Sequence, residues 1–193
     1  MQDALAAMSW AVLPDDERDL IEAAQGDLTR FTPLYDRYRV RLYAYLRIRV
    51  GSDEDAADLT HQVFLRALDA LPRYRVAGTP FAAWLFRIAR NAVTDHHRRR
   101  RDTITWDLLP PTLHPISNNE IDAELLRQEE QQALQALLTT LSSANRDLLV
   151  LRFVAGLSVR EIAVVVGKNE AATRKHLTRL LRRLAVQWEG QDR

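Results

Sequence analysis

The chain has 193 residues, of which 47% are hydrophobic, so it can form one or two folded domains and is not a disordered polymer. The formal net charge of +1 excludes a nucleic-acid interaction driven by overall charge, and no cysteine is present for a disulfide, a thiolate zinc site or a nucleophile. Residues 1–14 lack the basic stretch of a signal peptide and no apolar run is long enough to cross a bilayer, so we expect a soluble, cytoplasmic protein without membrane insertion.

Two amphipathic helices are predicted first, because apolar residues recur at steps of three and four. The first covers about 31–46, and Gly51 ends it. Ser52 or Asp53 can cap the second helix, whose apolar side extends over 56–71.

A third helix follows a loop over 72–80 that contains two prolines and a glycine. Thr79 or Pro80 opens this helix, its apolar side extends over 81–93, and it runs into four arginines at 98–101. The second helix begins with acidic residues, whereas the third is basic on its outer side. One surface therefore suits a protein partner and the other attracts phosphate.

The helical periodicity breaks between residues 102 and 119, where three prolines and a Ser-Asn-Asn run indicate a linker. Further helical segments are predicted at about 120–140 and 143–155, followed by a final pair split at Gly167.

The final pair has the signature of a helix-turn-helix. Ser158 and Glu161 form the capping-box pattern S-x-x-E, so a helix begins at Ser158. Gly167 supplies the turn, the small Ala163 lies four residues before it, and Asn169 can cap the following helix. A recognition helix reads base edges from its N-terminal residues and holds phosphates with basic side chains. We expect the first task for Asn169, Arg174 and Lys175, and the second for Arg179, Arg182 and Arg183.

These elements predict an all-α fold of two small helical domains joined by a flexible linker, with the helix-turn-helix in the C-terminal domain. The expected division is an N-terminal extension at 1–20, a first domain at 21–101, a linker at 102–122 and a second domain at 123–193.

Three stretches carry a resemblance to one family. Residues 57–68 read ADLTHQVFLRAL and resemble a polymerase-binding helix, while residues 81–99 read FAAWLFRIARNAVTDHHRR and closely resemble a promoter-melting helix. The stretch LLVLRF at 148–153, followed by GLS and EIA, resembles the C-terminal domain of the same family. The chain thus resembles the extracytoplasmic-function (ECF, group 4) sigma factors of bacterial RNA polymerase, which belong to the sigma-70 family.

This resemblance implies that the chain binds core RNA polymerase, recognises promoter DNA and directs promoter melting and transcription initiation. It implies no enzymatic activity, no cofactor and no metal, and control by an anti-sigma factor in a stress or envelope response. The residues that it assigns to the largest polymerase subunit are Asp58, Leu59, Gln62, Val63 and Phe64.

The resemblance also assigns two sets of DNA-binding residues. The loop at 74–79 would hold a base flipped out of the minus-ten element. The residues implied for that element are Tyr74, Arg75, Gly78, Thr79, Arg87, Arg90, Asn91, Arg98 and Arg99. Those implied for the minus-thirty-five element are Ser158, Arg160, Asn169, Arg174, Lys175, His176, Arg179 and Arg182. The sequence departs from the family at His61-Gln62, where Gln-Glu is usual, and at His176, where arginine is usual.

Two other functions fit parts of the sequence. A stand-alone helix-turn-helix regulator would bind promoter DNA without polymerase, but it needs a dimer interface and a sensor pocket that the N-terminal half does not resemble. A metal-dependent nuclease would use Asp95, His96 and His97. Adjacent histidines on a helix point about 100° apart and chelate one ion poorly, so this alternative is weaker.

Overall fold

The computed structural model describes residues 16–75, 78–99, 138 and 140–189, and every element of secondary structure in them is helical. The N-terminal part consists of α2 (Asp16–Gly26), η1 (Leu28–Phe31), α3 (Thr32–Val50), α4 (Asp53–Ala70), η2 (Leu71–Arg73) and α5 (Phe81–Arg99). The C-terminal part consists of α7 (Ser143–Leu149), the π-helical turn η4 (Val150–Val154), α8 (Val159–Val166) and α9 (Glu170–Glu189). The expected all-α class is confirmed.

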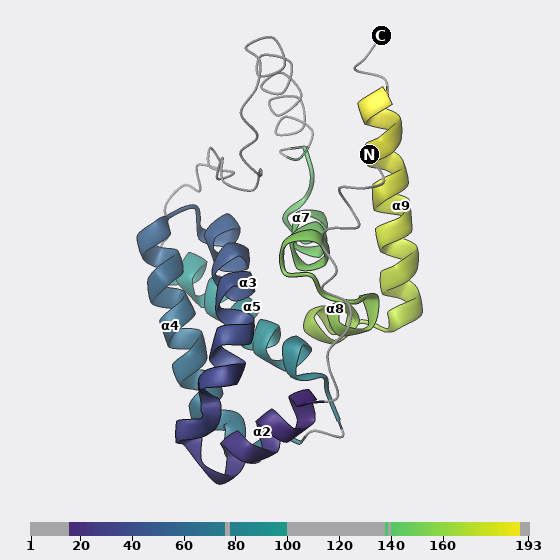
Figure 1. Cartoon of the computed structure of the whole chain (residues 1–193). Coiled ribbons are helices and arrows are strands. Elements are labelled where there is room, and N and C mark those ends of the chain that lie inside the picture. Colours follow the sequence, from purple (N-terminus) through teal and green to yellow (C-terminus); the bar gives the residue numbers. More distant parts are fainter. Residues whose placement is uncertain (1–15, 76–77, 100–137, 139, 190–193) are drawn as a thin grey trace, which may run out of the picture.

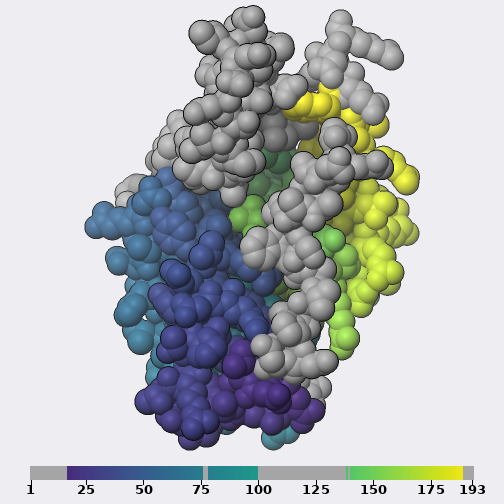
Figure 2. All heavy atoms as spheres, viewed as in Figure 1, coloured from purple at the N-terminus to yellow at the C-terminus, as the bar shows by residue number. Residues whose placement is uncertain are grey.

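The helices α3, α4 and α5 pack against one another, and α7 to α9 lie beside them (Figure 1). In the space-filling view, atoms of α4 lie at one side of the molecule and those of α9 form the opposite edge (Figure 2). Helix α2 crosses the boundary predicted at residue 20. The predicted linker at 102–122 and most of the helix predicted at 120–140 lie outside the described residues.

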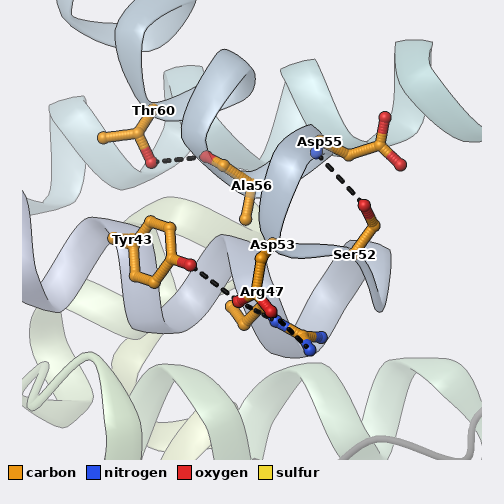
Figure 3. Close-up of polar contacts among 7 residues, drawn as sticks. All are labelled: Tyr43, Arg47, Ser52, Asp53, Asp55, Ala56 and Thr60. Atoms are coloured by element: carbon orange, nitrogen blue, oxygen red, sulfur yellow. Dashed lines mark hydrogen bonds and ion pairs between the residues drawn. The ribbon is translucent and has the colours of Figure 1, made fainter.

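The junction of α3 and α4 is built as the local sequence predicts. Gly51 has a φ of 76°, which glycine adopts without strain, and its N–H donates to the Arg47 carbonyl. The Ser52 hydroxyl accepts from the Asp55 N–H and so caps α4. The Asp53 carboxylate accepts from Arg47 Nε at 2.6 Å and from the Tyr43 hydroxyl at 2.8 Å (Figure 3). These two bonds, Arg47 first, lower the pKa of Asp53.

The helix-turn-helix is also present. Ser158 and Glu161 make both bonds of a capping box at the start of α8. The helix ends at Gly167, whose φ is 69°, and the Lys168 N–H reaches back to the Ala163 carbonyl at 2.9 Å. The Asn169 side chain accepts from the Ala172 N–H at 2.7 Å and caps α9. The turn that sets α9 against α8 is therefore fixed by contacts within six residues.

One continuous apolar core runs through both parts of the chain. It contains Tyr45 and Phe86 from the N-terminal part together with Leu151, Leu157 and Ile162 from the C-terminal part. Helix α5 packs against α8, and α3 packs against η4. The sequence predicted two domains joined by a linker, but it did not predict that their apolar cores merge.

Candidate nucleic-acid and protein interfaces

Helix α4 presents only part of the predicted polymerase-binding set to solvent. Asp58 and Gln62 are exposed. Leu59, Val63 and Phe64 are buried, with Phe64 only 3% exposed, because the apolar side of α4 packs against α3 and α5. These three side chains hold the helix in place, and their contact with a partner stays a prediction.

An apolar groove of about 410 Å³ lies beside this helix, between its outer side and the start of α3. Its walls include Phe31, Tyr35 and Phe64, and the Tyr35 and Phe64 rings lie 4.6 Å apart. Leu28 and Leu65 are exposed at its edge. A large apolar side chain of a partner could pack in this groove, next to the polar residues of α4.

The loop predicted to hold a flipped base is anchored by its first residue. The Tyr74 ring is buried against Phe81 and Trp84, with ring centres 5.7 and 4.9 Å away, and its hydroxyl donates to the Thr79 carbonyl. Burial raises the pKa of Tyr74 to about 12, and the nearby Glu17 adds to the effect. Tyr74 therefore anchors the loop, and its contact with a base stays a prediction.

The remainder of the loop is more accessible. Arg75 and Gly78 are exposed, Thr79 is half-buried, and the Gly78 N–H donates to the Arg75 carbonyl at 3.2 Å. A residue that the sequence did not single out holds the loop from outside. The Gln25 amide of α2 donates to the carbonyls of Leu71 and Tyr74 at 2.9 and 2.6 Å.

Helix α5 carries a narrow polar strip along its outer side. Its members are exposed, recur at steps of three and four, and are Arg87, Asn91, Thr94 and Arg98. Arg99 is exposed next to the strip, and Arg98 pairs with Asp95 at 3.2 Å. Arg100 and Arg101 lie outside the described residues.

Arg90 of α5 is engaged within the protein. Its Nε donates to Asp147 Oδ2 at 2.9 Å, and Asp147 lies on α7 in the other part of the chain. The Tyr45 hydroxyl donates to Asp147 Oδ1 at 3.0 Å, and Arg49 Nε lies 3.5 Å from the same oxygen. The Asp147 side chain is 4% exposed. Burial, followed by the charge of Asp147, raises the pKa of Tyr45 above its ordinary value.

A second polar contact joins the same two parts. The Arg41 guanidinium of α3 donates through Nε and Nη2 to the Ala155 carbonyl, at 2.8 and 2.6 Å. Arg41, Tyr45 and Arg49 are four residues apart and share one side of α3. That four-residue spacing on one side of α3 was the signal available in the sequence.

Helix α9 displays the predicted basic residues. Arg160 of α8 is exposed, as are Arg174, Lys175, Arg179 and Arg182 of α9. A groove of about 490 Å³ runs along this side, and its polar lining consists of Asn145, Lys168, Lys175, His176, Arg179 and Arg183. Five of these six side chains are basic, so the groove suits an anionic ligand.

Several predicted minus-thirty-five residues already have a structural partner. The side chains of Ser158 and Asn169 serve as helix caps. Arg174 pairs with Glu170, and the His176 ring Nε2 lies 2.8 Å from Asn145 Oδ1. His176 is half-buried, so it closes the groove floor against α7. These residues remain candidates, with the exposed arginines and Lys175 most accessible to DNA.

Within the described ranges, no three His, Cys, Asp or Glu side chains are grouped to hold a metal ion. The His97 ring donates from Nε2 to the Arg49 carbonyl at 3.0 Å. Burial lowers the pKa of His97, and the charges of Arg49 and His96 act in the same direction. No helix among these residues is long and apolar enough to cross a membrane.

Comparisons with known proteins decide the family. Residues 34–103 match the family model Sigma-70 region 2, and residues 131–184 match Sigma-70, region 4. The chain is 34% identical over 169 residues to the ECF RNA polymerase sigma factor SigD of Mycobacterium tuberculosis. The aligned region covers 84% of this chain and 79% of SigD. The chain belongs to the ECF sigma factors.

A second relative and a solved structure agree with this family assignment. The sigma factor is 37% identical over 172 residues to the ECF RNA polymerase sigma factor BldN of Streptomyces coelicolor, and the match covers 86% of this chain and 64% of BldN. The chain thus spans less than two thirds of the length of BldN. The solved structure of CnrH in complex with the cytosolic domain of CnrY matches with a TM-score of 0.65 and 25% identity, over 91% of this chain and 99% of that chain.

Family membership confirms the resemblance and sets aside the nuclease alternative, because a sigma factor is not an enzyme. Within the sigma factor, α3 to α5 belong to region 2, and α7 to α9 belong to region 4. The contacts of Asp147 with Tyr45, Arg49 and Arg90 form one cluster that joins region 2 to region 4. The bond from Arg41 to the Ala155 carbonyl joins the same two regions.

Proposed function

We propose that this sigma factor binds core RNA polymerase through α4, places region 2 on the minus-ten element and places region 4 on the minus-thirty-five element. The observation that carries this proposal is that each family region exposes its own basic strip, on α5 and on α9. Because the net charge is only +1, these strips are the places where the chain can attract DNA phosphates.

The polymerase contact is proposed for the outer side of α4 and the apolar groove beside it. Asp58, His61, Gln62 and Leu65 are exposed there, and the helix begins with three acidic residues. A mixed surface of exposed polar side chains around an apolar groove is typical of protein–protein interfaces. Phe64 contributes by forming one wall of the groove.

The minus-ten contact is proposed for the strip Arg87, Asn91 and Arg98 and for the exposed loop residues Arg75 and Gly78. The anchored ring of Tyr74 fixes the start of the loop beside the N-terminus of α5. A loop anchored at its first residue is suited to holding a base that has left its stack, since less of the loop has to be ordered at that moment.

The minus-thirty-five contact is proposed for the N-terminal half of α9. Lys175 and Arg179 line its basic groove, and Arg174 and Arg182 are exposed on the same helix. A recognition helix enters the major groove with its N-terminal residues, so base reading falls to Arg174 and Lys175.

Regulation is proposed by analogy with the relatives. CnrH is described in complex with the cytosolic domain of CnrY. We infer that an anti-sigma factor binds the present chain in the cytoplasm, where it would cover surfaces needed for polymerase or DNA.

The proposed function is tested by mixing the purified chain with bacterial core RNA polymerase and assaying initiation on promoter fragments. Co-elution and specific initiation are expected. The variant Asp58→Lys should lose polymerase binding, whereas Asp19→Lys, which changes an exposed acid on α2, should not. Binding of duplex DNA by the free chain without any co-elution would contradict the proposal and favour a stand-alone regulator.

A further inference from the structure

The cluster between regions 2 and 4 has the composition of an anion site. Region 2 supplies all the donors, which are Tyr45 and Arg49 from α3 and Arg90 from α5. Region 4 supplies one acceptor, the Asp147 carboxylate, and both of its oxygens are used. Two guanidinium groups and one hydroxyl thus converge on a single carboxylate.

The Asp147 carboxylate does not satisfy all of these donors. The Arg49 side chain is 10% exposed, and its buried Nε and Nη1 have no hydrogen-bond partner in the described part of the chain. A phosphate of the nucleic-acid backbone, like a carboxylate, presents two anionic oxygens that guanidinium groups bind, so it can take the place of Asp147 among these donors. The site therefore has spare donors for a phosphate.

We propose that Tyr45, Arg49 and Arg90 form one anion site that holds either the Asp147 carboxylate of region 4 or a backbone phosphate of nucleic acid. Arg90 is one of the residues implied for minus-ten binding, and its side chain is 40% exposed even with Asp147 in place. Region 4 docked on region 2 and nucleic acid bound at this site are then mutually exclusive states. The identity of the second ligand rests on the proposed function.

Both attractive and repulsive charges lie between the docked regions 2 and 4. Asp147 pairs with Arg49 and Arg90, whereas its neighbour Arg146 carries a charge of the same sign as theirs. Burial lowers the pKa of Arg146, and the charge of Arg49 lowers it further. Like charges oppose docking, and a phosphate bound at the anion site would in addition repel the Asp147 carboxylate.

Separation is required by the size of the promoter. Elements named for positions ten and thirty-five lie about 25 base pairs apart, or about 85 Å at 3.4 Å per step. A folded chain of this length has a radius of gyration of about 16 Å. Region 4 docked on region 2 cannot reach both elements, so capture of the anion site by phosphate couples DNA binding to opening.

The test uses the full chain and two readouts. The sequence has no cysteine, so donor and acceptor dyes can be attached at Arg66→Cys on α4 and Val186→Cys on α9, both exposed. Energy transfer between the dyes reports docking. Fluorescence anisotropy with a labelled single-stranded DNA of about 20 nucleotides, repeated at two salt concentrations, reports phosphate binding.

Three variants separate the two roles of the site. Asp147→Asn removes the carboxylate charge, and Arg41→Ala removes the bonds to Ala155 without touching the anion site. Both should reduce energy transfer, and both should strengthen DNA binding, by about tenfold for Asp147→Asn. Arg49→Gln should also reduce energy transfer but should not strengthen binding, and its salt slope should fall by about one.

A gain in DNA affinity for Arg49→Gln equal to that of Arg41→Ala would overturn the shared site. Unchanged energy transfer for Asp147→Asn would overturn the role of Asp147 in docking. If Arg49→Gln does not fold, as judged by thermal melting, Arg90→Gln makes the same prediction at a more exposed position. Because neither readout uses polymerase, normal results here with no initiation in the transcription assay would contradict the proposed function alone.

Discussion

Arg90 Nε and Asp147 Oδ2 are 2.9 Å apart although 57 positions separate the two residues in the sequence. The first lies on the helix that resembles a promoter-melting helix, and the second lies at the start of region 4. The bond places a carboxylate on a side chain that we propose to meet DNA, and under that proposal Arg90 exchanges Asp147 for DNA when the promoter is bound.

Replacement of Arg174 by alanine is expected to weaken use of the minus-thirty-five element and to leave affinity for core polymerase unchanged. If Arg174 reads a base, the loss is about 1–3 kcal/mol and specificity relaxes at one position. Transcription from promoters with single-base changes, together with a polymerase binding assay, measures both effects. Arg30→Ala, an exposed arginine on η1, is the matched control, and reduced polymerase affinity for Arg174→Ala would contradict the division of surfaces.

Alanine variants of Phe64 and its neighbour Leu65 should differ in whether they lose stability or polymerase binding. Phe64 is buried, so Phe64→Ala is expected to lower the free energy of unfolding by about 3–5 kcal/mol. Leu65 is exposed at the edge of the groove, so Leu65→Ala should change stability by less than about 0.5 kcal/mol while weakening polymerase binding. Thermal melting and a polymerase pull-down compare the pair, and equal loss of stability would refute the assignment of Leu65 to a binding surface.

Stability should fall on mild acidification because of His97. Its pKa is lowered in the folded state, chiefly by burial, so the folded protein binds fewer protons than the unfolded chain. Stability is then present above the usual histidine pKa of about 6.5 and is lost as the pH falls below it. Urea unfolding at several pH values measures the slope. His97→Gln should flatten it, whereas His61→Gln, at an exposed position on α4, should not.

Gln25 is expected to matter for the loop before α5. Gln25→Ala removes two hydrogen bonds, to Leu71 and Tyr74, and should cost about 1–3 kcal/mol of stability. Amide exchange should quicken at Tyr74 and Gly78, whose N–H groups donate within this segment. Gln62→Ala removes an exposed glutamine on α4 and should leave exchange in the loop unchanged.

The local features of the fold followed from the sequence because their contacts are local. Gly51 and Ser52 form a stop and a cap, and Ser158 with Glu161 forms a capping box, all through partners within four residues. The family resemblance supplied the two regions and their order. Each of these signals can be found in a short window of sequence.

The burial of individual side chains could not be predicted from the sequence. Phe64 and Tyr74 belong to segments that resemble binding segments, yet the packing of other helices turns both inward. The partner of Asp147 lies in another region of the chain, and no periodic pattern connects them. Helix α2 was not assigned a role, because its contacts to Tyr38 and Tyr74 involve residues 21 and 49 positions away.

The π-helical turn at Val150–Val154 sets the direction in which the residues after α7 face. The Ala155 N–H bonds to the Val150 carbonyl, one residue further back than in an α-helix, and the Ala155 carbonyl is the atom that Arg41 holds. Deleting one residue from α7, with this turn kept, would rotate everything after it by about 100°. Arg41 would then meet a different face of region 4. The length of α7 up to this turn is thus a constraint on the docked state, and length changes in α7 are expected to be less tolerated than most substitutions there.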